Sequence, residues 1–159
     1  MNPKSILITG GAGFIGSEFV RQVFAKGNYS KIFVLDKLTY ASDLRRIEKE
    51  LKDENVELLE FDVNQTDKYL SVLPECVEVV HFAAESHVDR SIAEGFPFLN
   101  TNIIGTYKLL ETMKKFHLPG TDNLKGITEA VIQNASQSEK LEGSYISLAA
   151  ASGDLNSIF

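Results

Sequence analysis

The sequence has a single cysteine, no cluster of basic residues and no long hydrophobic run. One cysteine, Cys76, cannot form an internal disulfide, which fits a reducing compartment. The net charge of −6 without a Lys/Arg cluster argues against nucleic acid and anionic membranes as partners. The first apolar run has only strand length, too short for a signal peptide or a membrane span. We therefore expect a cytoplasmic protein that binds neither nucleic acid nor membrane.

Metal-binding and acid–base motifs are also missing. Glu60 and His81 do not have the spacing of metal ligands, and Glu85 with Asp89 is weak evidence for a pair of catalytic carboxylates. No base accompanies Cys76, so we expect it to fill the core. His81 lies within a predicted strand and is expected to be a packed, hydrogen-bonded histidine. The sequence thus predicts no metal site and no catalytic residue of these kinds.

The sequence instead shows strand-length apolar runs that alternate with helical patterns. Strands are predicted over residues 5–9, 31–36, 56–62 and 77–84, and helices over 14–26, 43–52, 67–73 and 98–116. Gly27 is the expected C-terminal cap of the first helix, and Pro97 fits the first turn of the last. Apolar residues form one stripe on each of two helices: Ile15, Phe19 and Val23 on the first, and Leu99, Ile103, Thr106, Leu110 and Met113 on the last.

This alternation predicts an α/β fold with a Rossmann-like, doubly wound parallel sheet that is incomplete, with about four strands. The composition changes near Leu118, and residues 119–159 are rich in Ser, Ala, Asn and Gly. Within that tail, Leu124, Ile127 and Val131 suggest one amphipathic helix and residues 145–151 another, but no further strand. We predict one domain over residues 1–118, and a helical or irregular tail over 119–159 that packs on it or is partly disordered.

The glycines between the first strand and the first helix carry the clearest functional signal. Two spacings overlap in ITGGAGFIGS (8–17): Gly11-x-Gly13-x-x-Gly16, and Gly10-x-x-Gly13-x-x-Gly16. A helix start with unpaired N–H groups can hold a pyrophosphate when no side chain blocks the backbone. The alternative P-loop needs a lysine where this chain has Ser17. The glycines therefore predict a dinucleotide site.

Asp36 strengthens this prediction because it lies at the end of the second predicted strand, 20 positions after Gly16. A carboxylate there accepts hydrogen bonds from the ribose hydroxyls and repels a 2′-phosphate, which favours NAD over NADP. Lys37 complicates the choice, since a cation could tolerate phosphate. The alternative is a plain glycine-rich turn beside a solvated aspartate, which the order of strand, glycines, helix, strand and Asp disfavours.

With these residues in view, the chain resembles the extended short-chain dehydrogenase/reductase family, in particular the dTDP-glucose 4,6-dehydratases. The matching stretches are ITGGAGFIGS (8–17), LDKLTYAS (35–42), FDV (61–63), HFAAESHVDRSI (81–92) and TNIIGTY (101–107). The resemblance covers about residues 4–116, and we find none in 117–159. It implies an NAD-binding part with no sugar-nucleotide domain.

The resemblance also implies which residues contact NAD. Backbone contacts to the pyrophosphate would come from Phe14 and Ile15 beside the glycines, and adenine contacts from Asp62 and Val63. The full predicted set is Gly10, Gly13, Phe14, Ile15, Gly16, Asp36, Lys37, Leu38, Thr39, Asp62, Val63, Ala83, Ala84, Glu85 and Thr101. Ser86, His87 and Arg90 would face the nucleotide sugar, although Asp89 and Arg90 could equally form a structural pair, and His87 could be an ordinary loop histidine.

The family's catalytic groups are expected in a Thr-Asp-Glu strand end and a Tyr-x-x-x-Lys helix, and the tail contains neither. Thr121-Asp122 is followed by Asn123, and Ala149 stands four residues after Tyr145. We therefore expect the NAD-binding portion of a dTDP-glucose 4,6-dehydratase-like enzyme that is inactive as this chain. The alternatives are a non-catalytic NAD(H)-binding module, or part of another nucleotide-sugar dehydratase or epimerase. The resemblance further implies a homodimer through helix 98–116.

Overall fold

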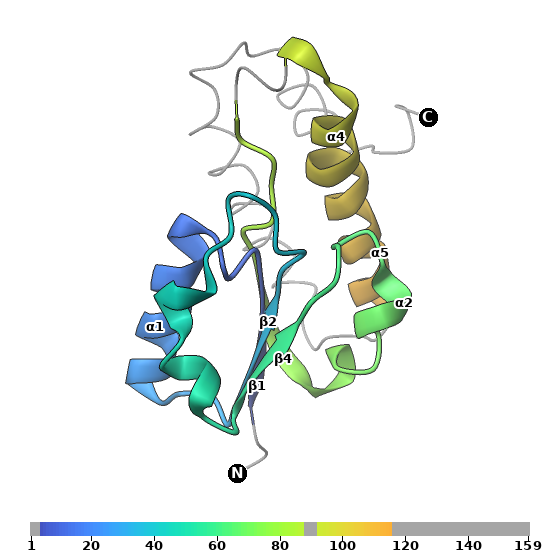
Figure 1. Ribbon diagram of the computed structural model, residues 1–159. Helices are drawn as coiled ribbons and strands as arrows, with labels where there is room; N and C mark the ends of the chain where they lie inside the picture. Colours follow the sequence, from blue (N-terminus) through green and yellow to red (C-terminus); the bar gives the residue numbers. More distant parts are fainter. Residues whose placement is uncertain (1–3, 88–91, 116–159) are drawn as a thin grey trace.

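The structure, a computed structural model, describes residues 4–87 and 92–115, and a four-stranded sheet lies at its centre (Figure 1). The strands are β1 (Ser5–Thr9), β2 (Lys31–Leu35), β3 (Val56–Leu59) and β4 (Cys76–His81). Their order is β3-β2-β1-β4, and every pairing is parallel. The predicted parallel sheet of about four strands is confirmed.

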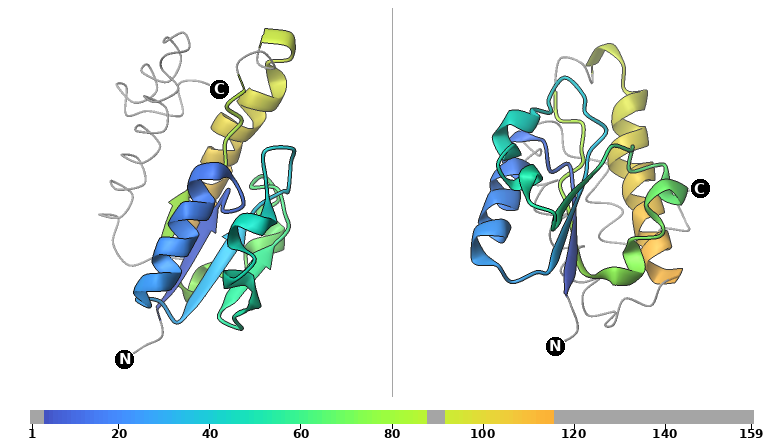
Figure 2. Two further views of the ribbon diagram at one scale, coloured as in Figure 1. Left: turned by 60° about the vertical axis from the view of Figure 1, so that its left-hand side comes forward. Right: turned by 60° about the horizontal axis from the view of Figure 1, so that its bottom comes forward.

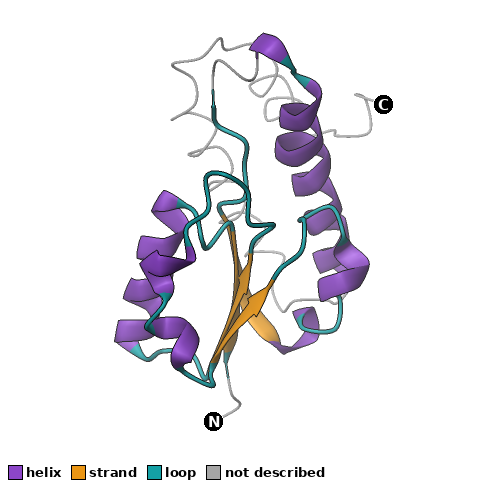
Figure 3. Ribbon diagram, viewed as in Figure 1, coloured by secondary structure: helices purple, strands orange, loops and turns teal. Residues whose placement is uncertain are grey.

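Helical segments cover both faces of this sheet, as Figure 1, Figure 2 and Figure 3 show. One face carries α1 (Phe14–Lys26) together with the 3₁₀ turns η1 (Leu44–Ile47) and η2 (Glu50–Lys52). The opposite face carries α2 (Thr66–Tyr69) and the long helical stretch that ends in α5 (Thr106–Lys115). Because helices lie on both faces, the doubly wound architecture is also confirmed.

The central strand β1 contributes to a hydrophobic core on each face. Successive side chains of a strand point to opposite sides of the sheet. Leu7 therefore packs in one core with Leu109 of α5, while Ile6 and Ile8 pack in the other with Val20 of α1. Burial on both sides explains why the predicted strand reads as a continuous apolar run.

Helix α1 confirms its predicted range and cap, and of its predicted apolar stripe Val23 is buried and Phe19 packs against the core. Gly27 is the C-terminal cap, with a left-handed φ of 62° and its N–H bonded to the Phe24 carbonyl at 3.1 Å. The buried residues of α1 are Gly16, Ser17, Val20 and Val23. Ile15, the first residue of the predicted stripe, is 56% exposed. The close approach of the glycine loop places Gly16 and Ser17 inward instead, so the buried stripe is rotated.

Several predicted boundaries are wrong. The predicted strands 31–36, 56–62 and 77–84 end instead at Leu35, Leu59 and His81, because the chain turns at each of these points to form the loops over the carboxyl ends of the sheet. The predicted α-helix over 43–52 is the two 3₁₀ turns η1 and η2; the Asp43 side chain accepts from the Arg45 N–H and tightens the first. The predicted helix 67–73 is α2 followed by the 3₁₀ turn η3 (Leu73–Glu75).

The last helical stretch is predicted correctly in extent but not in geometry. It consists of α4 (Phe96–Phe98), the π-helix η4 (Leu99–Gly105) and α5. Thr101, Gly105, Leu109 and Met113, spaced four residues apart, are buried, and so is Thr112. Leu99, the first residue of the predicted apolar stripe, is 46% exposed. The wider π-helical turn shifts the stripe, which a period of 3.6 residues could not predict.

Gly105 sets how closely this stretch approaches the sheet. A Cβ added at Gly105 would lie 2.7 Å from Cγ1 of Val63, in the loop after β3. The absence of a side chain therefore brings η4 against the loop that carries Asp62 and Val63.

Some sequence predictions fall outside the described residues. These are the tail helices near Leu124 and over 145–151, and the position of Arg90. Among residues 4–87 and 92–115, no helix combines the length and the apolar character that crossing a membrane requires.

Candidate cofactor site

The glycine loop between β1 and α1 forms the base of a cleft above the carboxyl ends of the strands. Gly10 takes a left-handed φ of 66°, and a Cβ there would lie 2.6 Å from the Ala83 nitrogen. A Cβ at Gly16 would overlap the Gly10 carbonyl oxygen, whereas one at Gly11 would strike Val34 in the core. Of the two overlapping spacings, Gly10, Gly13 and Gly16 thus shape the turn, and Gly11 allows packing.

The start of α1 presents backbone N–H groups without helical acceptors. The first intrahelical bond runs from the Ser17 N–H to the Gly13 carbonyl at 3.0 Å, so the N–H groups of Phe14, Ile15 and Gly16 precede it. Gly13 is the N-cap and has no side chain to cap them. Such a helix start carries a partial positive charge and suits a phosphate.

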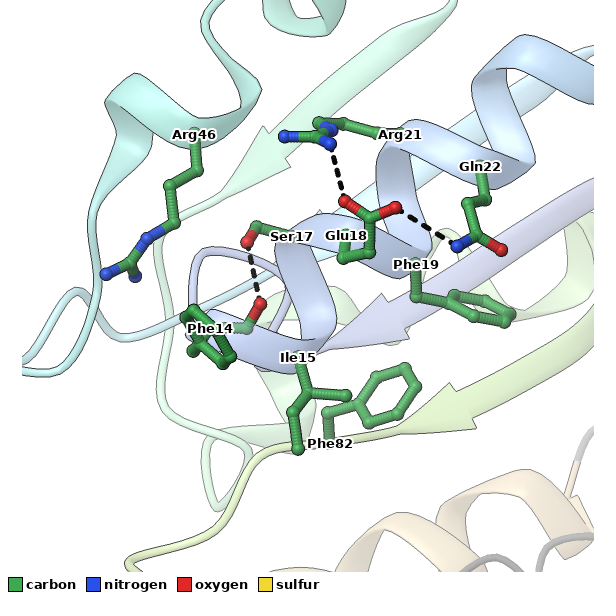
Figure 4. A pocket seen from close by; sticks show the side chains of 9 residues that line it. All are labelled: Phe14, Ile15, Ser17, Glu18, Phe19, Arg21, Gln22, Arg46 and Phe82. Atoms are coloured by element: carbon green, nitrogen blue, oxygen red, sulfur yellow. Dashed lines mark hydrogen bonds and ion pairs between the residues drawn. The ribbon is translucent and has the colours of Figure 1, made fainter.

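The side chains of Phe14 and Ile15 lie outside the cleft. They line a second hollow on the outer side of α1, together with Phe19, Arg46 and Phe82 (Figure 4). Phe14 is 80% exposed. The prediction for Phe14 and Ile15 concerned backbone contacts alone, and this arrangement leaves their side chains out of the way of a ligand in the cleft.

Asp36 joins the glycine loop to the end of β2. Its Oδ2 accepts from the Ala12 N–H at 2.9 Å, and its Oδ1 accepts from the Leu38 N–H at 2.9 Å and from the Ser42 hydroxyl at 2.7 Å. The residue is buried. A carboxylate offers about four lone-pair sites, so Oδ2 keeps capacity for one more donor, such as a ribose hydroxyl.

Lys37 points away from Asp36 and toward two other carboxylates. Its Nζ lies 3.1 Å from Oε1 of Glu85, 3.6 Å from Oδ2 of Asp62 and 3.4 Å from the Thr101 hydroxyl. The ammonium therefore links the loops after β2, β3 and β4 to η4. The cleft is lined by three carboxylates, those of Asp36, Asp62 and Glu85, and by one ammonium, that of Lys37, so its net charge is negative.

The Asp62 loop is ordered by its own side chains. Oδ1 of Asp62 accepts from the Asn64 N–H at 2.8 Å, and the Asp62 N–H donates to the Gln65 side-chain oxygen at 3.0 Å. Tyr69 donates its hydroxyl to the Val63 carbonyl at 2.6 Å, and burial raises the Tyr69 pKa. These bonds hold Asp62 and Val63 at the cleft in a fixed turn.

The turn Ala83–Glu85 forms the opposite side of the cleft. The Asn102 side chain accepts from the Glu85 N–H at 2.8 Å and donates to the Glu85 carbonyl at 2.9 Å. The Ala83 N–H donates to the Thr9 hydroxyl at 3.2 Å. Asn102 was not predicted as a site residue, although it lies in the stretch TNIIGTY that carries the resemblance.

Most of the predicted cofactor residues gather around this one cleft. Those that line it are Gly10, Gly13, Asp36, Lys37, Thr39, Asp62, Val63, Ala83, Ala84, Glu85 and Thr101. Gly16 and Leu38 support it from behind through the glycine contact and the Asp36 bond. Ser42 and Phe82 also line the cleft and were not predicted.

The predicted substrate residues lie at the exposed margin. Ser86 and His87 are exposed, and the His87 ring lies 6.0 Å from the Tyr40 ring in an edge arrangement. Arg90 lies outside the described residues, so its role stays a prediction.

Two other candidate chemistries find no support in the described part of the chain. Within residues 4–87 and 92–115, no three His, Cys, Asp or Glu side chains are grouped to hold a metal ion. Burial raises the pKa of the Cys76 thiol to about 12, which makes this cysteine a poor nucleophile at neutral pH.

The sequence model of the family described as GDP-mannose 4,6 dehydratase matches residues 7–140. The chain belongs to this family. The family match extends past residue 116, where the resembling motifs end. Membership in this dehydratase family agrees with the glycine loop and the four-stranded parallel sheet described above.

Individual relatives are similar over most of the chain. A dTDP-glucose 4,6-dehydratase of Mycolicibacterium smegmatis is 38% identical over 128 residues, 78% of this chain and 38% of that protein. A trifunctional UDP-glucose 4,6-dehydratase/UDP-4-keto-6-deoxy-D-glucose 3,5-epimerase/UDP-4-keto-L-rhamnose-reductase of Arabidopsis thaliana is 37% identical over 149 residues, 87% of this chain and 22% of that protein. The predicted resemblance to dTDP-glucose 4,6-dehydratases is confirmed.

The fold agrees as well. The crystal structure of DesIV (dTDP-glucose 4,6-dehydratase) from Streptomyces venezuelae with NAD and TYD bound matches with a TM-score of 0.67 and 40% identity. The match covers 70% of this chain and 36% of that one. This member of the dehydratase family therefore spans between about a fifth and two fifths of the length of these relatives.

Proposed function

We propose that this chain binds NAD in the cleft and is the cofactor-binding portion of a dTDP-glucose 4,6-dehydratase-like lyase. The observation that carries the proposal is the bare helix start at Gly13–Gly16 beside the buried carboxylate of Asp36. These two features supply an anion site and a hydroxyl acceptor within one cleft. The NAD bound to the dehydratase from Streptomyces venezuelae supports the choice of ligand.

Each part of NAD has a group in the cleft that suits it. The pyrophosphate would lie against the N–H groups of Phe14 and Ile15, and a ribose hydroxyl would donate to Asp36. The adenine would contact Asp62 and Val63, and the nicotinamide would lie toward Ala83–Glu85 and Thr101. When bound, NAD⁺ would supply a hydride acceptor for oxidation of the sugar.

The charges around the cleft favour NAD over NADP. Asp36 would repel a 2′-phosphate, and Lys37 is already paired with Glu85 and Asp62. Because these two carboxylates already hold the Lys37 ammonium, Lys37 is less able to bind the 2′-phosphate of NADP.

We further propose that this chain binds its cofactor without turning over a nucleotide sugar. The sequence lacks the Thr-Asp-Glu and Tyr-x-x-x-Lys elements, so no tyrosine–lysine pair starts the reaction. Residues 1–118 would form the binding unit, and Ser86 and His87 would face the sugar. The relatives act on both dTDP-glucose and UDP-glucose, as their names state, so either nucleotide suits the proposal.

Two finer points belong to the same proposal. The single cysteine supports a reducing, cytoplasmic location. The exposed outer side of the last helical stretch, with Leu99 and Tyr107, supports a homodimer through helix 98–116.

Isothermal titration calorimetry of the full chain with NAD⁺ and NADP⁺ tests the proposal. We expect NAD⁺ to bind at least tenfold more tightly than NADP⁺, and Gly13→Ala to weaken NAD⁺ binding about tenfold. The Gly13 backbone suits alanine, with φ −70° and ψ 174°, and the added Cβ would lie 3.1 Å from the Gly10 carbonyl oxygen, a contact that needs a shift of only a few tenths of an ångström. Thermal unfolding of the variant checks that it folds. Absence of heat and of thermal stabilisation with NAD⁺ would remove the proposal.

A second assay separates the dehydratase from a non-catalytic NAD-binding module. Incubation of the chain with NAD⁺ and dTDP-glucose or UDP-glucose should give no 4-keto sugar. Binding without turnover is the expected result for this chain. Formation of a 4-keto-6-deoxy product would show that the missing catalytic elements have substitutes in this chain.

A further inference from the structure

The side chain of His81 lies in the middle of a series of hydrogen bonds that joins β1, β4 and α5. His81, at the end of β4, is only 6% exposed. Its Nδ1 lies 2.6 Å from the hydroxyl of Thr9 on β1, and its Nε2 lies 3.0 Å from the hydroxyl of Thr106, the first residue of α5. The imidazole therefore joins the central strand to the helical stretch that packs on it.

The other bonds of the two hydroxyls determine where the imidazole carries its proton. The Thr106 hydroxyl donates its single hydrogen to the Asn102 carbonyl at 2.8 Å, so it accepts from His81 Nε2–H. In a neutral imidazole Nδ1 is then an acceptor, and the Thr9 hydroxyl donates to it. The same Thr9 oxygen accepts from the Ala83 N–H at 3.2 Å.

All of these bonds run in one direction, from Ala83 N–H through Thr9, His81 and Thr106 to the Asn102 carbonyl. The opposite tautomer would break this order, because Thr106 would have to donate to Nε2 and lose its bond to Asn102. Burial lowers the pKa of His81 to about 4, so the ring is neutral at neutral pH.

Both ends of this chain of bonds hold the turn Ala83–Glu85. At one end, Thr9 binds the Ala83 N–H directly. At the other, Asn102 uses its side chain to bind both backbone groups of Glu85. His81 fixes the position of the helix that carries Asn102 relative to the strand that carries Thr9. The spacing between these two anchors sets the shape of the turn.

We propose that His81 is a positioning residue that, as the Nε2–H tautomer, couples Thr9 to Thr106 and thereby fixes the turn Ala83–Glu85 at the cleft. The identity of the ligand that this turn contacts rests on the proposed function. The tautomer and the order of the turn do not depend on it.

Thr106 and Thr112 give a matched pair of variants on one helix. The Thr112 hydroxyl donates to the Lys108 carbonyl at 2.7 Å, the same bond to the residue four positions earlier that Thr106 makes. Of the two, Thr106 is also bonded to His81. Because Thr112 is buried, Thr112→Val should disturb folding at least as much as Thr106→Val does. Thr106→Ser restores the hydroxyl.

Nitrogen-15 NMR of the full chain, labelled at histidine, reads the His81 tautomer. In the wild type we expect Nε2–H with an unprotonated Nδ1. In Thr106→Val we expect a shift toward Nδ1–H, because Nε2 loses its acceptor while Thr9 can still accept. Thr112→Val and Thr106→Ser should keep the wild-type tautomer. A wild type in the Nδ1–H form would overturn the proposal.

Amide hydrogen exchange at Ala83 and Glu85, and calorimetric NAD⁺ affinity, measure the consequence for the turn. Thr106→Val should speed exchange at both amides and weaken NAD⁺ binding about threefold to tenfold, the effect of one lost hydrogen bond. Thr106→Ser should recover both. Equal effects from Thr112→Val would refute a specific positioning role. If the wild type binds no NAD⁺, the proposed function fails, and tautomer and exchange alone decide this inference.

Discussion

The two sides of the cleft are built from different parts of the chain. The β1–α1 side (Gly10–Gly16 with Asp36) offers backbone N–H groups and one carboxylate, within 27 consecutive residues. The β4 side (Ala83–Glu85) is held by side chains that come from β1, the loop after β2 and the last helical stretch. The β1–α1 side depends on the absence of side chains at its glycines. The β4 side depends on hydrogen bonds from specific side chains to the backbone of the turn. Substitutions should therefore damage the two sides in different ways.

Gly10→Ala should give the largest loss of stability, because Gly10 lies on the β1–α1 side at the point where it contacts Ala83 of the β4 side. The substitution places a Cβ 2.6 Å from the Ala83 nitrogen and forces a left-handed φ on alanine. We expect the free energy of unfolding to fall by more than about 3 kcal/mol in chemical denaturation. Gly27→Ala is the control, since Gly27 has φ +62° but no atom within 4 Å, and should cost about 1 kcal/mol. Equal losses would mean that the contact with Ala83 is unimportant.

Low pH should destabilise the folded chain through protonation of His81, which supports the β4 side of the cleft. Its pKa is lowered from 6.5 to about 4 in the folded chain. Between these pH values the unfolded state binds a proton that the folded state does not, so stability falls as the pH falls. The loss from His81 should reach about 3 kcal/mol at pH 4. Urea unfolding from pH 7 to pH 4 measures it.

His81→Gln should flatten this pH dependence, whereas His87→Gln, at an exposed position, should leave it unchanged. The other ionisable groups of the chain titrate equally in all three proteins. The difference between the profiles therefore isolates the contribution of the buried imidazole. Parallel profiles for wild type and His81→Gln would contradict the prediction.

Asp36→Asn should have an intermediate effect on stability, and it tests the role of the carboxylate on the β1–α1 side. An amide cannot accept at both positions that bind Ala12, Leu38 and Ser42. We expect a loss of about 2 kcal/mol in the free energy of unfolding, as for a hydrogen bond to a charged group. The preference for NAD⁺ over NADP⁺ should also narrow in calorimetry. An unchanged preference would mean that Asp36 serves structure alone.

Lys37→Met should have the smallest effect on stability. The Lys37 side chain is about a third exposed and its ion pairs are screened, so the expected loss is below about 1 kcal/mol. Removal of its charge leaves the cleft more negative, and the ratio of NAD⁺ to NADP⁺ affinity should rise. A falling ratio would show that Lys37 favours NAD⁺ over NADP⁺, contrary to our view.

The sequence predicted the β1–α1 side more completely than the β4 side, for a physical reason. Glycine spacing, strand length and the position of Asp36 are local, so Gly10, Gly13, Gly16 and Asp36 could be identified without a structure. The bonds of Asn102 to Glu85, and of His81 to Thr9 and Thr106, join residues from distant elements. Only the resemblance pointed to Glu85 and Thr101, and nothing in the local pattern paired Asn102 with the turn.

The fold shows the same division. Parallel strands and covering helices follow from alternating apolar runs, and these were predicted correctly. The π-helical geometry of η4 was not predicted, and neither was the close approach of Gly105 to Val63, which joins two distant elements. The predicted apolar stripe of α1 is exposed at Ile15, since the glycine loop draws Gly16 toward Gly10 and rotates the helix.

Leu38 links the charge of the cleft to its shape. It has a left-handed φ of 52°, uncommon for leucine, and its N–H reaches Oδ1 of Asp36. This hydrogen bond stabilises the left-handed conformation of Leu38. The carboxylate at position 36 thus supports the backbone of the residues that follow it as well as facing the ligand, so a substitution meant only to change cofactor preference would also remove a support of the turn at Leu38.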